Sequence, residues 1–144
     1  MSKPAPVRSL GLDFGTTNTV AAIADPAMPG GARTLRFPDV DGVHSVFRSA
    51  LDFWPEGRGR ERHIAVEAGP WAIRHFVESP EGSRFLQSFK TFAASPSFRS
   101  TNVHGKSFRF EDLLATFLGK VATHVDAADR PLPRRLIAGR PVTY

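Results

Sequence analysis

Residues 10–24, LGLDFGTTNTVAAIA, limit the possible folds more than any other segment of the chain. An apolar run carries Asp13, stops at Gly15 and two threonines, and then resumes as a second apolar run. Threonine, valine and isoleucine in the second run favour a strand, and glycine favours a tight turn. The segment therefore predicts two strands, at residues 7–14 and 17–24, joined by a short polar turn.

The aspartate in this segment points to a ligand. A carboxylate at the end of a buried strand is costly unless another group compensates for it. Gly15 lets the backbone turn and a ligand approach, and the amides of residues 14–18 can point inward as an anion nest. Phosphate and carboxylate are both anionic, so Asp13 fits such a nest if it holds a divalent cation through water. The turn with Thr16 and Thr17 thus predicts a magnesium–phosphate site, and a hairpin whose aspartate merely caps the turn is the structural alternative.

The rest of the chain predicts an α/β fold with a mixed sheet and packed helices. Further strands are expected at residues 33–37, 49–54, 62–66 and 135–139. Helices are expected at residues 68–79, 83–95 and 111–127. The last helix has an apolar stripe with a period of about 3.6 residues, which needs a flat partner. We therefore expect it to pack on an antiparallel meander of the first three strands, with strand 135–139 parallel beside strand 7–14.

Composition narrows the environment and the partners. The 144 residues fit one domain or a part of a larger one. The net charge is +5, but the basic residues are spread out, and the cluster at residues 57–63 has glycines and no aromatics. Nucleic acid is therefore an unlikely partner. The chain has no cysteine, no signal peptide and no apolar run long enough for a membrane span, so we expect a cytoplasmic protein without a membrane partner. The histidines show no ligand spacing, and we expect no structural metal.

One segment resembles a known family. GLDFGTTNTVAAI is similar to the first phosphate motif of the DnaK-type, seventy-kilodalton heat-shock chaperones. Weaker similarity continues through HSVFRSALDF, IAVEAGPWA, RFLQSFKTF and LIAGRPVTY. The GRPV version of the last segment is closer to the shorter, YegD-type members. The resemblance covers most of residues 8–144, and the first motif is its most specific part.

The resemblance implies the actin/sugar-kinase ATPase fold, with a ribonuclease-H-like sheet. Residues 7–144 would form its first lobe, with an inserted subdomain at 40–106, after a flexible tail at 1–6. The full-length protein would bind Mg-ATP, hydrolyse it and act on unfolded client proteins.

Residue by residue, the resemblance assigns roles in the site. Asp13 would hold water-bound magnesium, and Thr16 and Thr17 would bind phosphate oxygens. Lys90 would reach the γ-phosphate and orient the attacking water. Without the resemblance, Lys90 is equally well interpreted as a surface lysine of an amphipathic helix. Asn18 departs from the aromatic residue often found at its position, which bears on the contact to the base.

Other interpretations stay open. The family's second phosphate turn has no counterpart, so we expect a first-lobe fragment that binds ATP at millimolar concentration at best and does not hydrolyse it alone. Holliday-junction resolvases of the same sheet architecture also place an aspartate and a glycine after an apolar strand. They need several carboxylates around a metal, and Glu67, Glu111 and Asp112 are expected at helix starts instead. A third alternative is a non-catalytic binding module.

Overall fold

The computed structural model describes residues 7–139, so the tail at 1–6 and the end of the LIAGRPVTY segment lie outside the described residues. The strands are β1 (Ser9–Phe14), β2 (Asn18–Ala24), β3 (Ala32–Thr34), β4 (Phe37–Asp39), β5 (Gly42–His44), β6 (Phe47–Arg48), β7 (Ala50–Glu56), β8 (His63–Ala68), β9 (Arg84–Gln87), β10 (Thr101–Val103), β11 (Lys106–Phe108) and β12 (Arg135–Ala138). The helices are α1 (Gly69–Glu78), α2 (Thr91–Ala94) and α3 (Phe110–His124), with short 3-10 turns η1 (Gly59–Glu61) and η2 (Ala127–Asp129). This is a mixed α/β fold, as the sequence predicted.

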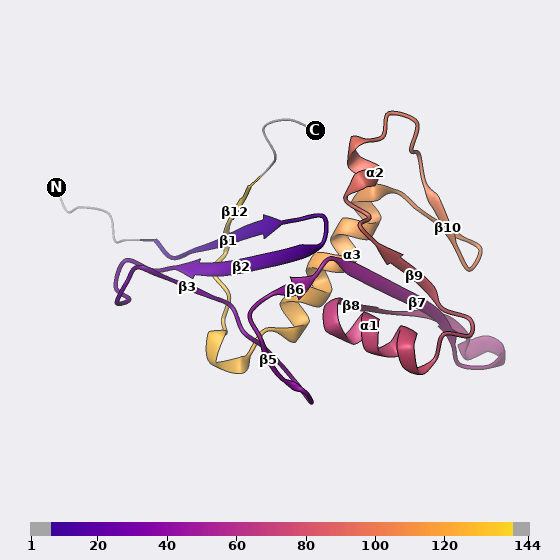
Figure 1. The fold of residues 1–144 in the computed structure, drawn as a ribbon, viewed down its shortest axis with the longest axis horizontal. Coiled ribbons are helices and arrows are strands. Elements are labelled where there is room, and N and C mark those ends of the chain that lie inside the picture. The colour runs from indigo at the N-terminus through magenta and orange to yellow at the C-terminus, as the bar shows by residue number, and fades with distance from the viewer. Residues whose placement is uncertain (1–6, 140–144) are drawn as a thin grey trace.

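The first sheet contains residues 10–24, which form β1, β2 and the turn between them. Its strand order is β12-β1-β2-β3, with β6 added beside β2. β1 and β2 are antiparallel, with Phe14 opposite Thr19, and β12 runs parallel to β1. The predicted hairpin and the predicted parallel strand at the end of the chain are confirmed (Figure 1).

The second sheet has the order β8-β7-β9, and α1 packs against it. α3 crosses behind the region where the two sheets meet (Figure 1). Phe117 of α3 lies 5.5 Å, centroid to centroid, from the rings of Phe14, Phe47 and Phe89. One hydrophobic cluster thus includes side chains from both sheets and α3. The expected packing of this helix against the first sheet is confirmed.

The helix predicted at residues 83–95 is wrong. Residues 84–87 form β9, an edge strand that pairs Leu86 with Leu51 of β7, and only residues 91–94 are helical. Apolar residues at Phe85, Leu86 and Phe89 match a helical period, but backbone pairing with β7 is available and decides the outcome. Ser88 then has a positive φ of 55°, which ends the strand and redirects the chain.

Two smaller expectations also change. The strand predicted at residues 33–37 is divided between β3 and β4, and β4 pairs with β5 in a hairpin of its own. Glu67 lies near the end of β8 and not at a helix start, whereas Glu111 and Asp112 do lie in the first turn of α3. None of the helices in residues 7–139 is long and apolar enough to cross a membrane.

Candidate functional site

The turn between β1 and β2 is tight and needs glycine. The Gly15 amide donates to the Asn18 carbonyl over 3.0 Å. A Cβ added at Gly15 would lie 2.3 Å from that same oxygen, far inside van der Waals contact. Glycine is therefore required here to let the chain close on itself, and the Gly15 amide is occupied by this closure. This differs from the expected role, in which Gly15 makes room for a ligand.

Ser49, directly after β6, holds the turn from behind. Its hydroxyl donates to the Gly15 carbonyl over 2.8 Å and lies 2.9 Å from the Thr19 hydroxyl, while its amide donates to the Thr17 carbonyl over 2.8 Å. Ser49 and Thr19 are both buried. Within residues 7–139 the amides and hydroxyls of Thr16 and Thr17 have no hydrogen-bond partner. The turn's carbonyls are satisfied inside the protein, and these exposed donors stay free.

The structure brings Lys90 to this turn from 76 positions away in the sequence. Its Nζ donates to the Phe14 carbonyl and lies 5.4 Å from the centroid of the Phe14 ring. Ser88 makes this possible, since its left-handed backbone turns the chain from β9 toward the end of β1. Serine adopts this conformation at a cost, which marks the connection as one where geometry outweighs local preference. Lys90 is thus not a residue of a long amphipathic helix.

Asp13 lies elsewhere than expected. It is exposed, whereas its neighbours Leu12 and Phe14 are buried toward α3. The cost of a buried carboxylate therefore does not apply to it. Among residues 7–139 its carboxylate has no ion-pair or hydrogen-bond partner, and it forms no ion pair with Lys90. A free, accessible carboxylate beside unpaired turn donors does fit magnesium, which takes one or two carboxylates with waters and phosphate oxygens.

Two hollows meet beside the turn. A hollow of about 220 Å³ lies between Thr16 and Thr17 on one side and Gln87 and Ser88 on the other. A larger hollow of about 730 Å³ follows α1 and is lined at one end by Asn18. Arg48 of β6 and Ile73 of α1 line both hollows. Of the residues predicted at the site, Thr16, Thr17 and Asn18 line these hollows. Asp13, Gly15 and Lys90 do not.

Sequence reasoning missed two residues near the turn. Arg48 stands opposite Asn18 in the β2–β6 pairing, and Ser49 follows it. Both lie in the segment HSVFRSALDF, which carried a family resemblance but no assigned residue role. A buried serine that accepts and donates hydrogen bonds across 34 positions has no local sequence signature. A lone arginine has none either, because its significance depends on the strand it pairs with.

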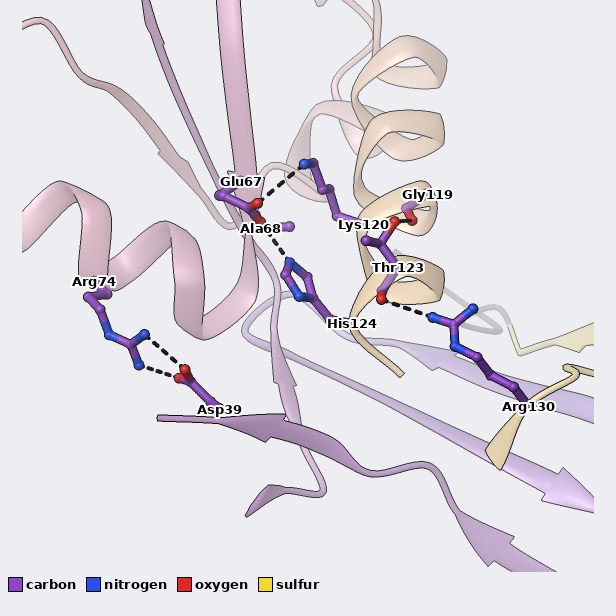
Figure 2. A network of polar contacts seen from close by, with 9 residues as sticks. All are labelled: Asp39, Glu67, Ala68, Arg74, Gly119, Lys120, Thr123, His124 and Arg130. Carbon is purple, nitrogen blue, oxygen red and sulfur yellow. Dashed lines mark hydrogen bonds and ion pairs between the residues drawn. The ribbon is translucent and has the colours of Figure 1, made fainter. Parts of the chain in front are cut away.

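A second polar cluster lies between β8 and α3 and contains Glu67, Lys120 and His124; it is here called the Glu67 cluster. His124 Nε2 and Lys120 Nζ, both from α3, lie 2.8 and 3.3 Å from the two Glu67 carboxylate oxygens (Figure 2). The His124 ring also stacks on Trp71 of α1 with the centroids 3.6 Å apart. The cluster therefore joins β8, α1 and α3.

The charges of the Glu67 cluster act on each other. Burial raises the pKa of Glu67, but the hydrogen bond from His124 and the positive charge of Lys120 outweigh it, so the pKa lies below its ordinary value. Arg74 of α1 likewise pairs with Asp39 of β4, as Figure 2 shows, and lowers the pKa of that carboxyl. These carboxylates are neutralised by cations of the same chain.

Comparison with models of protein families gives no match, and comparison with curated proteins gives none either. Any functional conclusion therefore depends on the site itself. The part of the chain described here, residues 7–139, contains no group of three or more His, Cys, Asp or Glu arranged to hold a metal ion. Nuclease chemistry of the resolvase type needs several carboxylates around a metal, and residues 7–139 do not bring such a group together.

Proposed function

We propose that the turn at Gly15–Asn18 binds the phosphates of a magnesium nucleotide, and that the chain is the first lobe of an actin-like ATPase of the DnaK type. The observation that supports this is the position of Lys90. Its ammonium group reaches the carbonyl before Gly15, next to a turn whose Thr16 and Thr17 donors have no partner in residues 7–139. A cation and several free N–H and O–H donors on one turn are groups that bind phosphate.

Each residue has a distinct part in this proposal. Thr16 and Thr17 donate to phosphate oxygens through amides and hydroxyls. Asp13 holds the magnesium ion through water, and the ion neutralises phosphate charge. Lys90 stabilises negative charge on the phosphoryl group that is transferred, an effect largest in the transition state. In a complete ATPase, Lys90→Ala would then lower turnover more than it weakens nucleotide binding.

Binding by this lobe alone is weak. A turn provides two to four charge-assisted contacts of about 1.5–3 kcal/mol each, and association itself costs several kcal/mol. We therefore propose a dissociation constant for Mg-ATP in the millimolar range. Client binding and a cytoplasmic location belong to the same proposal, as properties of a DnaK-type protein.

The test is a titration of the chain with Mg-ATP, followed by NMR of the backbone amides. We expect the largest shifts at Thr16 and Thr17, saturating in the millimolar range, with adenosine causing none of them. In Asp13→Asn the shifts should lose their dependence on magnesium while the melting temperature stays unchanged, since Asp13 is exposed. Unchanged Thr16 and Thr17 amides at about 10 mM Mg-ATP would reject the proposal.

A further inference from the structure

Arg48 lies beside the second half of the turn. β6 pairs with the start of β2, and this pairing sets Arg48 opposite Asn18. The Arg48 Nη1 atom lies 3.5 Å from the Asn18 side-chain oxygen, at the limit of a hydrogen bond. The side chain is exposed and lines both hollows that meet at the turn. Its guanidinium group is therefore held near the turn and is open to a ligand.

The charge of Arg48 is not neutralised within the described part of the chain. No carboxylate oxygen of residues 7–139 lies within 4.0 Å of its guanidinium group, the distance that defines an ion pair. Arg74 lines the same larger hollow and offers a direct comparison, because it is held by both Asp39 and Asp41. The larger hollow is lined by three carboxylates, Asp39, Asp41 and Glu78, beside the two arginines. The smaller hollow is lined by no carboxylate of the described residues, so an anion fits beside Arg48 on that side, next to Thr16 and Thr17.

Lys90 and Arg48 flank the turn on its two strands. Lys90 contacts the Phe14 carbonyl at the end of β1, and Arg48 contacts Asn18 at the start of β2. Thr16 and Thr17, whose donors are free within residues 7–139, lie between these two contact points along the chain, and Arg48 lines the smaller hollow together with them. An anion that uses the turn donors is thus offered one cation from each side.

The geometry points to Arg48 as a second phosphate-binding cation, so that the turn selects a ligand with at least two linked phosphate groups. One phosphate group is bound on the Lys90 side of the turn and the next on the Arg48 side. The planar guanidinium fork suits this role because it binds two oxygens of a phosphate group at once. This inference rests on the proposed phosphate-binding function and adds a binding residue, Arg48, which makes the turn prefer linked phosphate groups, such as those of pyrophosphate, over a single phosphate group.

The experiment compares magnesium pyrophosphate with inorganic orthophosphate as probes. Affinities are measured by amide shifts for the unmodified chain, for Arg48→Gln and for Arg60→Gln. Arg60 gives a matched control, since it is an exposed arginine of η1 that lines neither hollow. We expect the unmodified chain and Arg60→Gln to prefer pyrophosphate by about tenfold or more. Arg48→Gln should lose this preference and bind pyrophosphate about tenfold to a hundredfold more weakly.

The outcomes separate this inference from the proposed function. Pyrophosphate binding that is equal in Arg48→Gln and Arg60→Gln would overturn the role of Arg48 and leave phosphate binding at the turn in place. If the unmodified chain binds neither pyrophosphate nor Mg-ATP, the role of Arg48 and the proposed phosphate site are both overturned. Because Arg48 is exposed, Arg48→Gln should have the same melting temperature as Arg60→Gln. Arg48→Lys, which keeps the charge and loses the fork, should retain only part of the preference.

Discussion

The Gly15–Asn18 turn and the Glu67 cluster are both built from polar groups that are distant in the sequence, but they differ in how their charges are used. In the Glu67 cluster, one carboxylate is shared by Lys120 and His124, so cation and anion belong to the same chain. At the turn, Lys90 contacts the neutral carbonyl and the ring of Phe14 but no carboxylate of residues 7–139, and the nearby threonine donors have no partner there. The first arrangement holds secondary structure together, and the second leaves binding capacity for a ligand.

Paired polar groups therefore act mainly on stability, and unpaired polar groups act mainly on ligand binding. A carboxylate that a lysine and a histidine satisfy contributes to the free energy of unfolding, and removing it leaves their part-buried polar groups without a partner. Exposed donors without a partner contribute little to stability, because water satisfies them in the unliganded protein. Variants in the two regions should therefore separate the two properties.

The largest effect on stability is expected for Gly15→Ala. The new Cβ would meet the Asn18 carbonyl at 2.3 Å, and both are fixed by backbone, so the turn has to open. We expect a loss of about 3 kcal/mol in the free energy of unfolding, together with loss of phosphate binding. Denaturant unfolding measures the loss. Gly119→Ala is the control, since this exposed helical site in α3 is open and alanine there should stabilise by about 0.5–1 kcal/mol. An unchanged free energy of unfolding in Gly15→Ala would contradict the close contact in this turn.

Glu67→Gln should cost about 1–2 kcal/mol near neutral pH, because Lys120 and His124 lose their shared carboxylate. The pKa of Glu67 is lower in the folded state than its ordinary value of 4.5. The stabilisation is therefore fully present above this value and is lost as the pH falls through the folded pKa. Denaturant unfolding at several pH values should show the difference between the two proteins shrinking on acidification. A difference that stays constant down to about pH 2 would rule out this linkage.

Ser49→Ala should have a smaller effect, about 1 kcal/mol. The variant removes the donor to the Gly15 carbonyl and the partner of the buried Thr19 hydroxyl, but the Ser49 amide still holds Thr17. Thermal melting should record this loss, and the turn should become more mobile in amide exchange. Ser97→Ala, at an exposed serine, is the matched control and should change little. Equal melting of both variants would show that Ser49 does not hold the turn.

The two regions also differ in how well the sequence predicts them. The turn was located from Gly15 and its threonines, because tight turns and strand ends depend on local backbone preferences. The residues that contact the turn, Ser49 and Arg48, are not predictable in this way, since they reach it through the β2–β6 pairing. The wrong helix at 83–95 has the same origin, because pairing with β7 overrides a local apolar period. The Glu67 cluster joins three elements, and no short motif indicates it.

For Asp13, the sequence suggested the wrong environment. The sequence placed it at the end of an apolar strand, which suggested burial, and the structure places it on the exposed face of β1. The strand's alternation puts Leu10, Leu12 and Phe14 toward α3, so the neighbours of Asp13 in the sequence do not share its environment. The proposal that it holds magnesium thus depends on its accessibility and not on a burial cost.

The most direct test that the turn binds phosphate and the Glu67 cluster stabilises the fold is to measure Mg-ATP affinity and melting temperature for both Lys90→Met and Glu67→Gln. Lys90→Met should weaken Mg-ATP binding about tenfold or more and change the melting temperature little, since the lysine contacts a neutral carbonyl and the Phe14 ring but no carboxylate of residues 7–139. Glu67→Gln should lower the melting temperature and leave Mg-ATP affinity unchanged. The reverse result, with Lys90→Met destabilised but binding normally, would show that this lysine is only a structural contact and would contradict the assignment of the turn as a phosphate site.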